Sequence, residues 1–111
     1  MGKQDRHAFR KGKRSELVAL QALQRLRLEG VIRDFSFRDE PGVDFKIQLP
    51  DSREMLLQVK SSHAGSTEHR RRYQKVPCVI VRYGDRQGKT PDPDTLIENV
   101  RESIRDCIES F

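Results

Sequence analysis

The sequence predicts an α/β domain in which a mixed four-stranded sheet is flanked by helices. Apolar residues recur at intervals of three and four over 18–26 and 96–111, which is typical of amphipathic helices. The segment 43–49 alternates apolar and polar residues, and 76–83 is almost continuously apolar; both patterns are typical of strands. With 111 residues, the chain has the usual length of one domain, so we assign 1–111 to a single domain.

The first helix is expected over 15–29, with Gly30 available to end it. The basic segment 1–14 either precedes this helix as a flexible arm or extends it backwards. One apolar stripe predicts the helix: Val18, Ala19, Ala22, Leu23 and Leu26.

Three strands are expected next. Residues 31–38 are rich in β-branched and aromatic side chains, which favours a strand. Turn residues at 39–42 precede a second strand over 43–49, and a turn at 50–52 leads to a third over 55–62. The second and third strands therefore form an antiparallel hairpin.

A short helix is expected over 66–73, followed by a strand over 76–83 and a loop over 84–94. Pro77 must lie at the start of its strand or at a sheet edge, because it has no backbone donor. The last helix is expected to begin at Thr95, where Thr95 and Glu98 fit a capping box. Its apolar stripe comprises Leu96, Ile97, Val100, Ile104, Cys107, Ile108 and Phe111.

The composition is polar, with 34% apolar and 35% charged residues. Leu, Ile, Val and Phe nevertheless make up about a quarter of the chain, above the ~20% that indicates disorder. No apolar run approaches the ~18–20 residues that cross a bilayer, and no signal-peptide pattern follows the basic N-terminus. We therefore expect a cytoplasmic protein without a membrane partner, in which Cys78 and Cys107 are reduced core residues.

The formal net charge is +5, and the positive charge is clustered. Clusters of this kind suit a polyanion such as nucleic acid, although a solvated basic surface gives the same pattern. The candidate phosphate-binding residues are Arg10, Lys11, Lys13, Arg14, Arg70, Arg71, Arg72 and Lys75.

The hairpin pattern gathers three polar residues on one face. If the turn is centred near Asp51, paired residue numbers sum to about 102, and Asp44 lies opposite Gln58. Lys60 lies two residues farther along and therefore on the same face. The opposite face would be apolar, with Phe45, Ile47, Leu57 and Val59.

These residues suit the chemistry of phosphodiester hydrolysis. Mg²⁺ prefers oxygen ligands and keeps several waters, so Asp44, Gln58 and the carbonyl of Val59 could hold it beside a phosphate. Mn²⁺ would serve equally. Lys60 could orient or deprotonate the attacking water, or offset the charge that develops in the transition state.

The run Gly-Val-Asp44, followed across a turn by Leu-Gln58-Val-Lys60-Ser-Ser, resembles the PD-(D/E)xK nuclease superfamily in its QxK form. That superfamily includes restriction endonucleases and Holliday-junction resolvases, and its αβββαβ core matches the predicted order, with an extra C-terminal helix here. The resemblance implies a Mg²⁺-dependent DNA endonuclease, structure-selective in repair or recombination or active in restriction, that forms a homodimer. It also implies that Asp44 and Gln58 are metal ligands, that Lys60 is catalytic and that Glu16 is an accessory acid.

Two features depart from the family pattern and leave alternatives open. Asp44 follows Gly42-Val43 rather than proline, and Gln58 replaces an acid; a neutral amide binds Mg²⁺ less strongly than a carboxylate. Asp44 and Lys60 could instead form an ordinary cross-strand ion pair. The alternatives are a catalytically inactive nucleic-acid-binding module on the same fold, with RNA a second choice after DNA, and a protein-interaction subunit.

Overall fold

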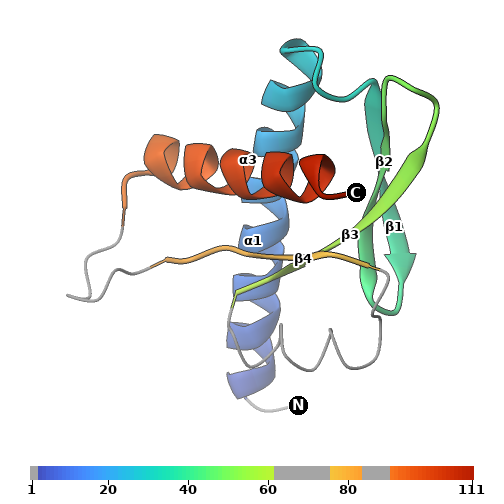
Figure 1. Ribbon diagram of the computed structural model, residues 1–111. Helices are drawn as coiled ribbons and strands as arrows, with labels where there is room; N and C mark the ends of the chain where they lie inside the picture. Colours follow the sequence, from blue (N-terminus) through green and yellow to red (C-terminus); the bar gives the residue numbers. More distant parts are fainter. Residues whose placement is uncertain (1–2, 62–75, 84–90) are drawn as a thin grey trace.

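The computed structural model describes residues 3–61, 76–83 and 91–111, with only the backbone described at 3–13 and at 39. The predicted helix at 66–73 therefore lies outside the described residues. The elements (Figure 1) are α1 Lys3–Leu28, β1 Asp34–Glu40, β2 Val43–Gln48, β3 Glu54–Lys60, β4 Cys78–Ile80 and α3 Pro93–Glu109. They confirm the predicted α/β class with a mixed four-stranded sheet.

The strands lie in the order β1-β2-β3-β4. The β1–β2 and β2–β3 pairs are antiparallel, whereas β4 runs parallel to β3. Phe45 pairs with Leu57 and Ile47 with Met55, so paired residue numbers sum to 102 and the predicted hairpin register is confirmed. β4 is shorter than the predicted strand at 76–83, and Pro77 lies just before it, where its carbonyl accepts a hydrogen bond from Gln58 N at 3.0 Å.

Both helices contribute to one core on one face of the sheet. α1 and α3 contact each other, and α1 also contacts β3 while α3 contacts β4. The core buries the apolar residues that alternate along one face of β2 and β3. It also buries the apolar stripes of α1 and α3. The main contributors are Ala19, Leu23, Leu26, Phe45, Ile47, Leu57, Val59, Val79, Leu96, Val100 and Ile104. The predicted partition of the hairpin into an apolar face and a polar face is therefore correct.

The helix α1 extends twelve residues upstream of the expected start at Ser15 and ends near Gly30 as predicted. Gly30 has a φ of 80°, a conformation that glycine adopts without a steric cost. Its N–H donates to Arg27 O, and Val31 N–H donates to Leu26 O at 3.0 Å, which closes the helix end. No helix among the described residues is both long and apolar enough to cross a membrane.

The closing turn corrects the predicted start of the first strand. Val31 N–H bonds back to α1, and the Ile32 side chain is buried in the core. These two residues therefore complete the helix end instead of opening a strand. Regular pairing begins at Asp34, opposite Gln48.

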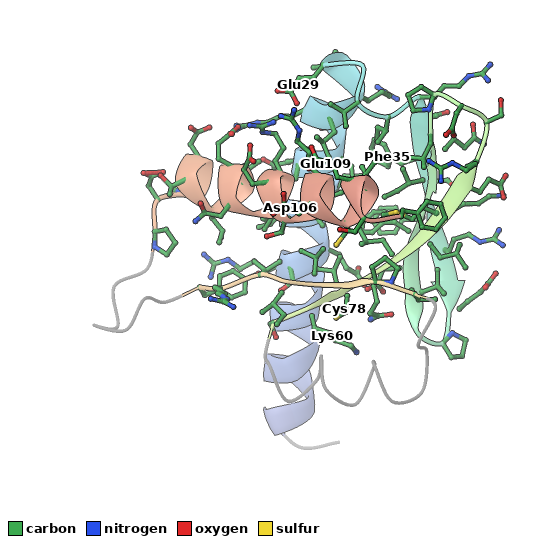
Figure 2. All side chains as sticks on the ribbon, viewed as in Figure 1. Glu29, Phe35, Lys60, Cys78, Asp106 and Glu109 are labelled. Carbon is green, nitrogen blue, oxygen red and sulfur yellow. The ribbon has the colours of Figure 1, made fainter. Side chains whose placement is uncertain are left out.

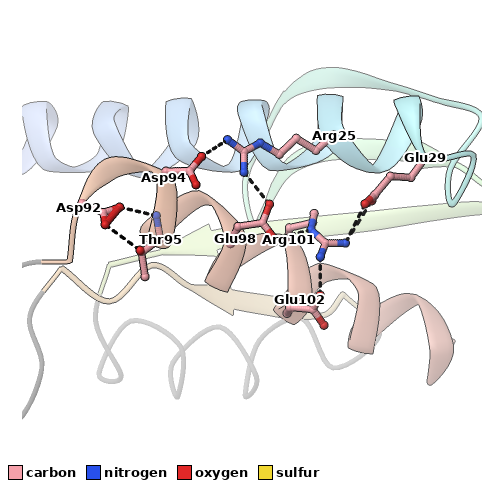
Figure 3. Close-up of polar contacts among 8 residues, drawn as sticks. All are labelled: Arg25, Glu29, Asp92, Asp94, Thr95, Glu98, Arg101 and Glu102. Carbon is pink, nitrogen blue, oxygen red and sulfur yellow. Dashed lines mark hydrogen bonds and ion pairs between the residues drawn. The ribbon is translucent and has the colours of Figure 1, made fainter.

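The start of α3 also differs from the prediction. Asp92 is the N-cap and Pro93 the first helical residue, a position that suits proline. The Asp92 carboxylate accepts hydrogen bonds from Thr95 N at 2.7 Å and Thr95 Oγ1 at 2.9 Å, and the backbone bond in particular holds the pKa of Asp92 below its usual range. The predicted capping box of Thr95 with Glu98 is wrong, because Glu98 binds arginines instead (Figure 3).

Two arginines join α1 to α3 through carboxylates (Figure 3). Arg25 on α1 bonds to Asp94 and Glu98 on α3. Arg101 on α3 bonds to Glu98 at 2.9 Å and reaches Glu29, just beyond α1, at 3.1 Å. Hydrogen bonds from Arg101, and then from Arg25, hold the pKa of Glu98 below its ordinary value of 4.5.

Replacing Arg101 with methionine is expected to lower Tm by a few degrees at pH 7. The lowered pKa of Glu98 means that its contribution to stability is complete above pH 4.5 and is lost as the pH falls through the folded-state pKa. The difference in Tm between the two proteins should therefore shrink near pH 3 in scanning calorimetry. Arg105→Met is the control, because Arg105 forms an ion pair with the exposed Glu109 on its own helix and does not join α3 to α1 in the described structure. An equal loss of Tm in Arg101→Met and Arg105→Met would contradict a stabilising role for the ion pairs of Arg101.

Candidate active site

The hairpin strands β2 and β3 separate at Asp44. Their regular pairing reaches Phe45 and Leu57 and extends no farther, although β2 begins at Val43 and β3 continues to Lys60. Beyond Leu57, β3 pairs with β4 instead, with Gln58 opposite Cys78 and Lys60 opposite Ile80. We refer to Asp44, Gln58, Val59 and Lys60 as the β2–β3 fork.

The Asp44 side chain takes the place of a backbone acceptor at the fork. Its Oδ2 accepts a hydrogen bond from Val59 N at 2.8 Å. Neighbouring peptide groups point to opposite edges of a strand, and Gln58 N and Lys60 O are both bonded to the β4 side. The N–H and C=O of Val59 therefore face β2, and the N–H is bonded to the Asp44 carboxylate.

Gln58 is buried at the fork with an unsatisfied acceptor. Only 6% of its surface is exposed. Its Nε2 lies 3.5 Å from the carbonyl oxygen of Val59, while its Oε1 has no hydrogen-bond partner in the described structure. A buried polar atom without a partner costs about 1–3 kcal/mol, so a group that binds Oε1 would recover free energy.

Lys60 is the last residue of β3 and follows Val59 in the chain. Its backbone carbonyl accepts a hydrogen bond from Val81 N at 2.8 Å, which fixes the end of the strand. Its side chain is half-buried and, in Figure 2, extends on the side of β4 away from α3. Another lysine on the same face, Lys46, is engaged in an ion pair with Glu54 at 3.0 Å.

The donor set of the fork fits a hard divalent cation. One carboxylate, one amide oxygen and one backbone carbonyl are oxygen ligands, and Mg²⁺ is commonly bound by one or two carboxylates with water and phosphate completing its shell. In the part of the chain whose side chains are described, no three His, Cys, Asp or Glu residues form a metal-binding group. The fork itself holds one acidic side chain, Asp44, beside the neutral oxygens of Gln58 and Val59.

Glu16 lies on α1 and is half-buried. The preceding residue, Ser15, is only 1% exposed, and its Oγ lies 2.8 Å from the hydroxyl oxygen of Tyr83, just after β4. Arg14 stacks over the Tyr83 ring at 4.9 Å from its centre. This turn of α1 is thus fixed against the end of β4, while the role of Glu16 at the fork stays a prediction.

The Ser15–Tyr83 contact is absent from the sequence-based prediction. One signal was available, because Ser15 lies four residues before Ala19 and so continues the apolar stripe of α1 by one turn. A polar residue on such a stripe needs a partner in the core, and Tyr83 provides it.

The predicted phosphate-binding residues are described only in part. Arg14 is exposed and contacts Tyr83. Arg10, Lys11 and Lys13 belong to α1, but their side chains are outside the description. The second cluster lies outside the described residues altogether: Arg70, Arg71, Arg72 and Lys75.

Comparison of the chain with protein-family models gives no match. Searches of curated proteins and of solved structures also find none that matches significantly.

Proposed function

We propose that this protein is a Mg²⁺-dependent nuclease that hydrolyses phosphodiester bonds in DNA. The observation that carries the proposal is the buried, unsatisfied Gln58 Oε1, on the strand whose next peptide N–H binds the Asp44 carboxylate. A ligand that bonds to Oε1 would remove the cost of leaving this buried acceptor unsatisfied. The motif's resemblance to the QxK form of the PD-(D/E)xK nucleases agrees with this chemistry.

The residues of the fork have different roles in the proposed mechanism. Asp44, Gln58 and the Val59 carbonyl would hold the metal ion, with Glu16 as an accessory acid from α1. When bound, Mg²⁺ supplies polarisation of the scissile phosphate and lowers the pKa of a water molecule. The hydrogen bond from Val59 N fixes one oxygen of Asp44, so the carboxylate is held in one orientation.

Lys60 is the catalytic cation of the proposal. Its ammonium group offers three donors on a flexible stem, enough to contact both the attacking water and a phosphate oxygen. It stabilises negative charge as that charge develops during in-line displacement.

Charge favours DNA or another polyanion as the substrate. The chain carries 22 Lys and Arg against 17 Asp and Glu, and its basic clusters would bind the sugar-phosphate backbone without reading sequence. We propose a structure-selective, resolvase-like enzyme of repair or recombination in preference to an enzyme of restriction alone. The proposal includes a cytoplasmic location and a homodimer, in which two active sites would cut both strands.

Supercoiled plasmid and a four-way DNA junction provide the direct test. The full-length protein is incubated with each, in Mg²⁺, Mn²⁺ or EDTA, and the products are resolved on gels. We expect cleavage that requires the metal, with the junction preferred to linear duplex. DNA bound but left intact in every metal condition would refute the enzyme.

A catalytically inactive nucleic-acid-binding module is the second candidate. The observation that favours it is the neutral side chain at Gln58, which leaves Asp44 as the one acidic residue in the fork. Such a module would bind DNA equally well with and without Mg²⁺, in contrast with the nuclease.

Gln58→Leu is expected to raise the stability of the protein while it abolishes cleavage. Leucine removes the buried acceptor that has no partner in the described structure, so the free energy of unfolding should rise by about 1 kcal/mol. The same change removes a metal ligand and should abolish metal-dependent cleavage. Urea denaturation and the plasmid assay measure the two effects. A loss of stability would show that Oε1 is already satisfied in the folded protein.

Gln58→Glu is the matched variant, for which we expect stronger Mg²⁺ binding and lower stability in the absence of metal. A carboxylate binds Mg²⁺ more strongly than an amide, so half-maximal cleavage should require less Mg²⁺. Without metal, the buried charge should destabilise the protein. Added Mg²⁺ should recover part of that loss by binding the folded state, whereas an unchanged Mg²⁺ requirement would argue against a ligand role for residue 58.

A further inference from the structure

Arg14 on α1 and Tyr83, just after β4, form a pair of planar groups. The Arg14 guanidinium lies over the Tyr83 ring, with its central carbon 4.9 Å from the ring centre. The ring is held in place by a hydrogen bond between its hydroxyl group and Ser15 Oγ at 2.8 Å, and Ser15 is only 1% exposed. The pair therefore has its geometry before any ligand binds, which lowers the entropic cost of binding.

The charge of Arg14 has no acidic partner in the described part of the chain. Two other arginines also lie over aromatic rings, Arg27 over Phe35 and Arg53 over Phe111. Each of these two also binds an aspartate. Arg14, in contrast, is exposed and forms no ion pair with a described residue. Its guanidinium is therefore available to an anionic ligand with a planar group.

The exposed surface around Arg14 offers two kinds of contact to such a ligand. The five N–H donors of a guanidinium lie in its plane, so they bind a phosphate at the edge of the group. The face of the plane has no donor, and the bases of unpaired nucleotides stack on arginine planes. Leu17 lies three residues after Arg14, on the neighbouring part of the helix surface, and adds an apolar side chain that is 53% exposed.

The pair lies near the end of β3 that carries Lys60. The Lys60 carbonyl accepts a hydrogen bond from Val81 N at 2.8 Å, and Tyr83 follows Val81 by two residues. Two residues span at most about 7 Å, so the backbone of Tyr83 is close to the end of the strand that carries Gln58 and Lys60. A nucleic-acid strand bound at the β2–β3 fork would therefore lie close to Arg14 and Tyr83.

We propose that Arg14 and Tyr83 form a stacking site for the base of an unpaired nucleotide. The base would lie on the face of the Arg14 guanidinium that points away from the Tyr83 ring, and a phosphate would contact the edge of the guanidinium. Because both faces of a base in a duplex are covered by neighbouring bases, the site would select single-stranded segments. The inference rests on the proposed function in one respect, namely that the ligand is a nucleic acid.

Two labelled single strands of equal length test the site: oligo(dT), and an abasic strand with the same number of phosphates. Binding of the full chain is measured by fluorescence anisotropy in EDTA, so that the result depends neither on a metal ion nor on cleavage. We expect oligo(dT) to bind about tenfold more tightly than the abasic strand, because only oligo(dT) has bases that can stack.

Arg14→Lys separates stacking from charge, because lysine keeps the positive charge but has no planar face. Binding to oligo(dT) should weaken about tenfold, while binding to the abasic strand should stay near the wild-type value. Tyr83→Leu removes the supporting ring and should have the same selective effect, with circular dichroism to show that the variant is folded. Arg33→Lys is the control and should change neither affinity, because Arg33 is also exposed but lies over no ring in the described structure.

Equal affinity of the wild-type protein for the two strands would overturn the stacking site, as would an absence of binding to both. Arg14→Lys that binds both strands like wild type, or that weakens both equally, would also overturn it. The stacking site and the nuclease can fail separately. Selective binding to oligo(dT) without cleavage of plasmid in Mg²⁺ would support the stacking site and refute the nuclease. Metal-dependent cleavage without selective binding would support the nuclease and refute the stacking site.

Discussion

Lys60→Met is expected to lower the rate of metal-dependent DNA cleavage at least about 100-fold, because it removes the charge that offsets the developing negative charge on phosphate. Methionine keeps a chain of similar length at a half-buried position, so Tm should change little. Binding of DNA should persist, since one phosphate contact among many is lost. Single-turnover cleavage rates and filter binding measure the two effects.

Lys46→Met is the matched control for charge. Lys46 lies on the same strand face as Asp44 but is held in an ion pair with Glu54. Its loss should lower DNA affinity no more than Lys60→Met does and should leave the single-turnover rate within a few-fold of wild type. Equal rates for the two variants would contradict a catalytic role for Lys60.

Phe45→Ala is expected to lower the free energy of unfolding by about 3–5 kcal/mol. Phe45 has no exposed surface, and its ring packs against Phe35 and Phe37 with centroid separations of 6.5 and 4.7 Å. A loss of this size is a large part of the stability of an ordinary domain. Because Asp44 precedes it on β2, the fork should lose its order together with the core, and cleavage should fall in parallel with folding.

Phe37→Ala provides the comparison within the same aromatic cluster. Its ring also contacts Phe45, but the residue is 55% exposed at the sheet edge. We expect a loss of less than about 1 kcal/mol in urea denaturation, since little apolar surface is transferred from water at this position. Comparable losses for both variants would show that the core is centred elsewhere.

The sequence predicts the face and register of the hairpin well. Alternation over 43–49 and a turn near Asp51 are strong local signals, and a slip of one residue would expose Phe45, Ile47 and Leu57. The observed pairing of Phe45 with Leu57 follows from this constraint. The polar face that carries Asp44, Gln58 and Lys60 can thus be identified from the alternation alone.

The separation of β2 and β3 could not be predicted from that pattern. It depends on β4 taking over the backbone groups of β3 after Leu57, a contact between segments distant in the sequence. The bond from Val59 N to Asp44 Oδ2 exists only because the strands have separated. The unsatisfied Gln58 Oε1 likewise follows from burial by the whole fold.

The ends of the helices were predicted less well than their apolar faces. For α3, the sequence offers two residues that could cap its N-terminus. Asp92 and Thr95 both precede apolar positions of α3, and Pro93 favours Asp92 as the cap. Thr95 then lies inside the first turn, and Glu98 is free to join Arg25 and Arg101.

A crystal structure of the protein soaked in Mn²⁺ tests the metal site most directly, since anomalous scattering identifies the ion. We predict a single strong peak at the β2–β3 fork, within about 2.0–2.6 Å of a carboxylate oxygen of Asp44 and of Gln58 Oε1. The same peak should be missing in Gln58→Leu. A fork without manganese, with Lys60 paired to Asp44, would contradict the proposed nuclease.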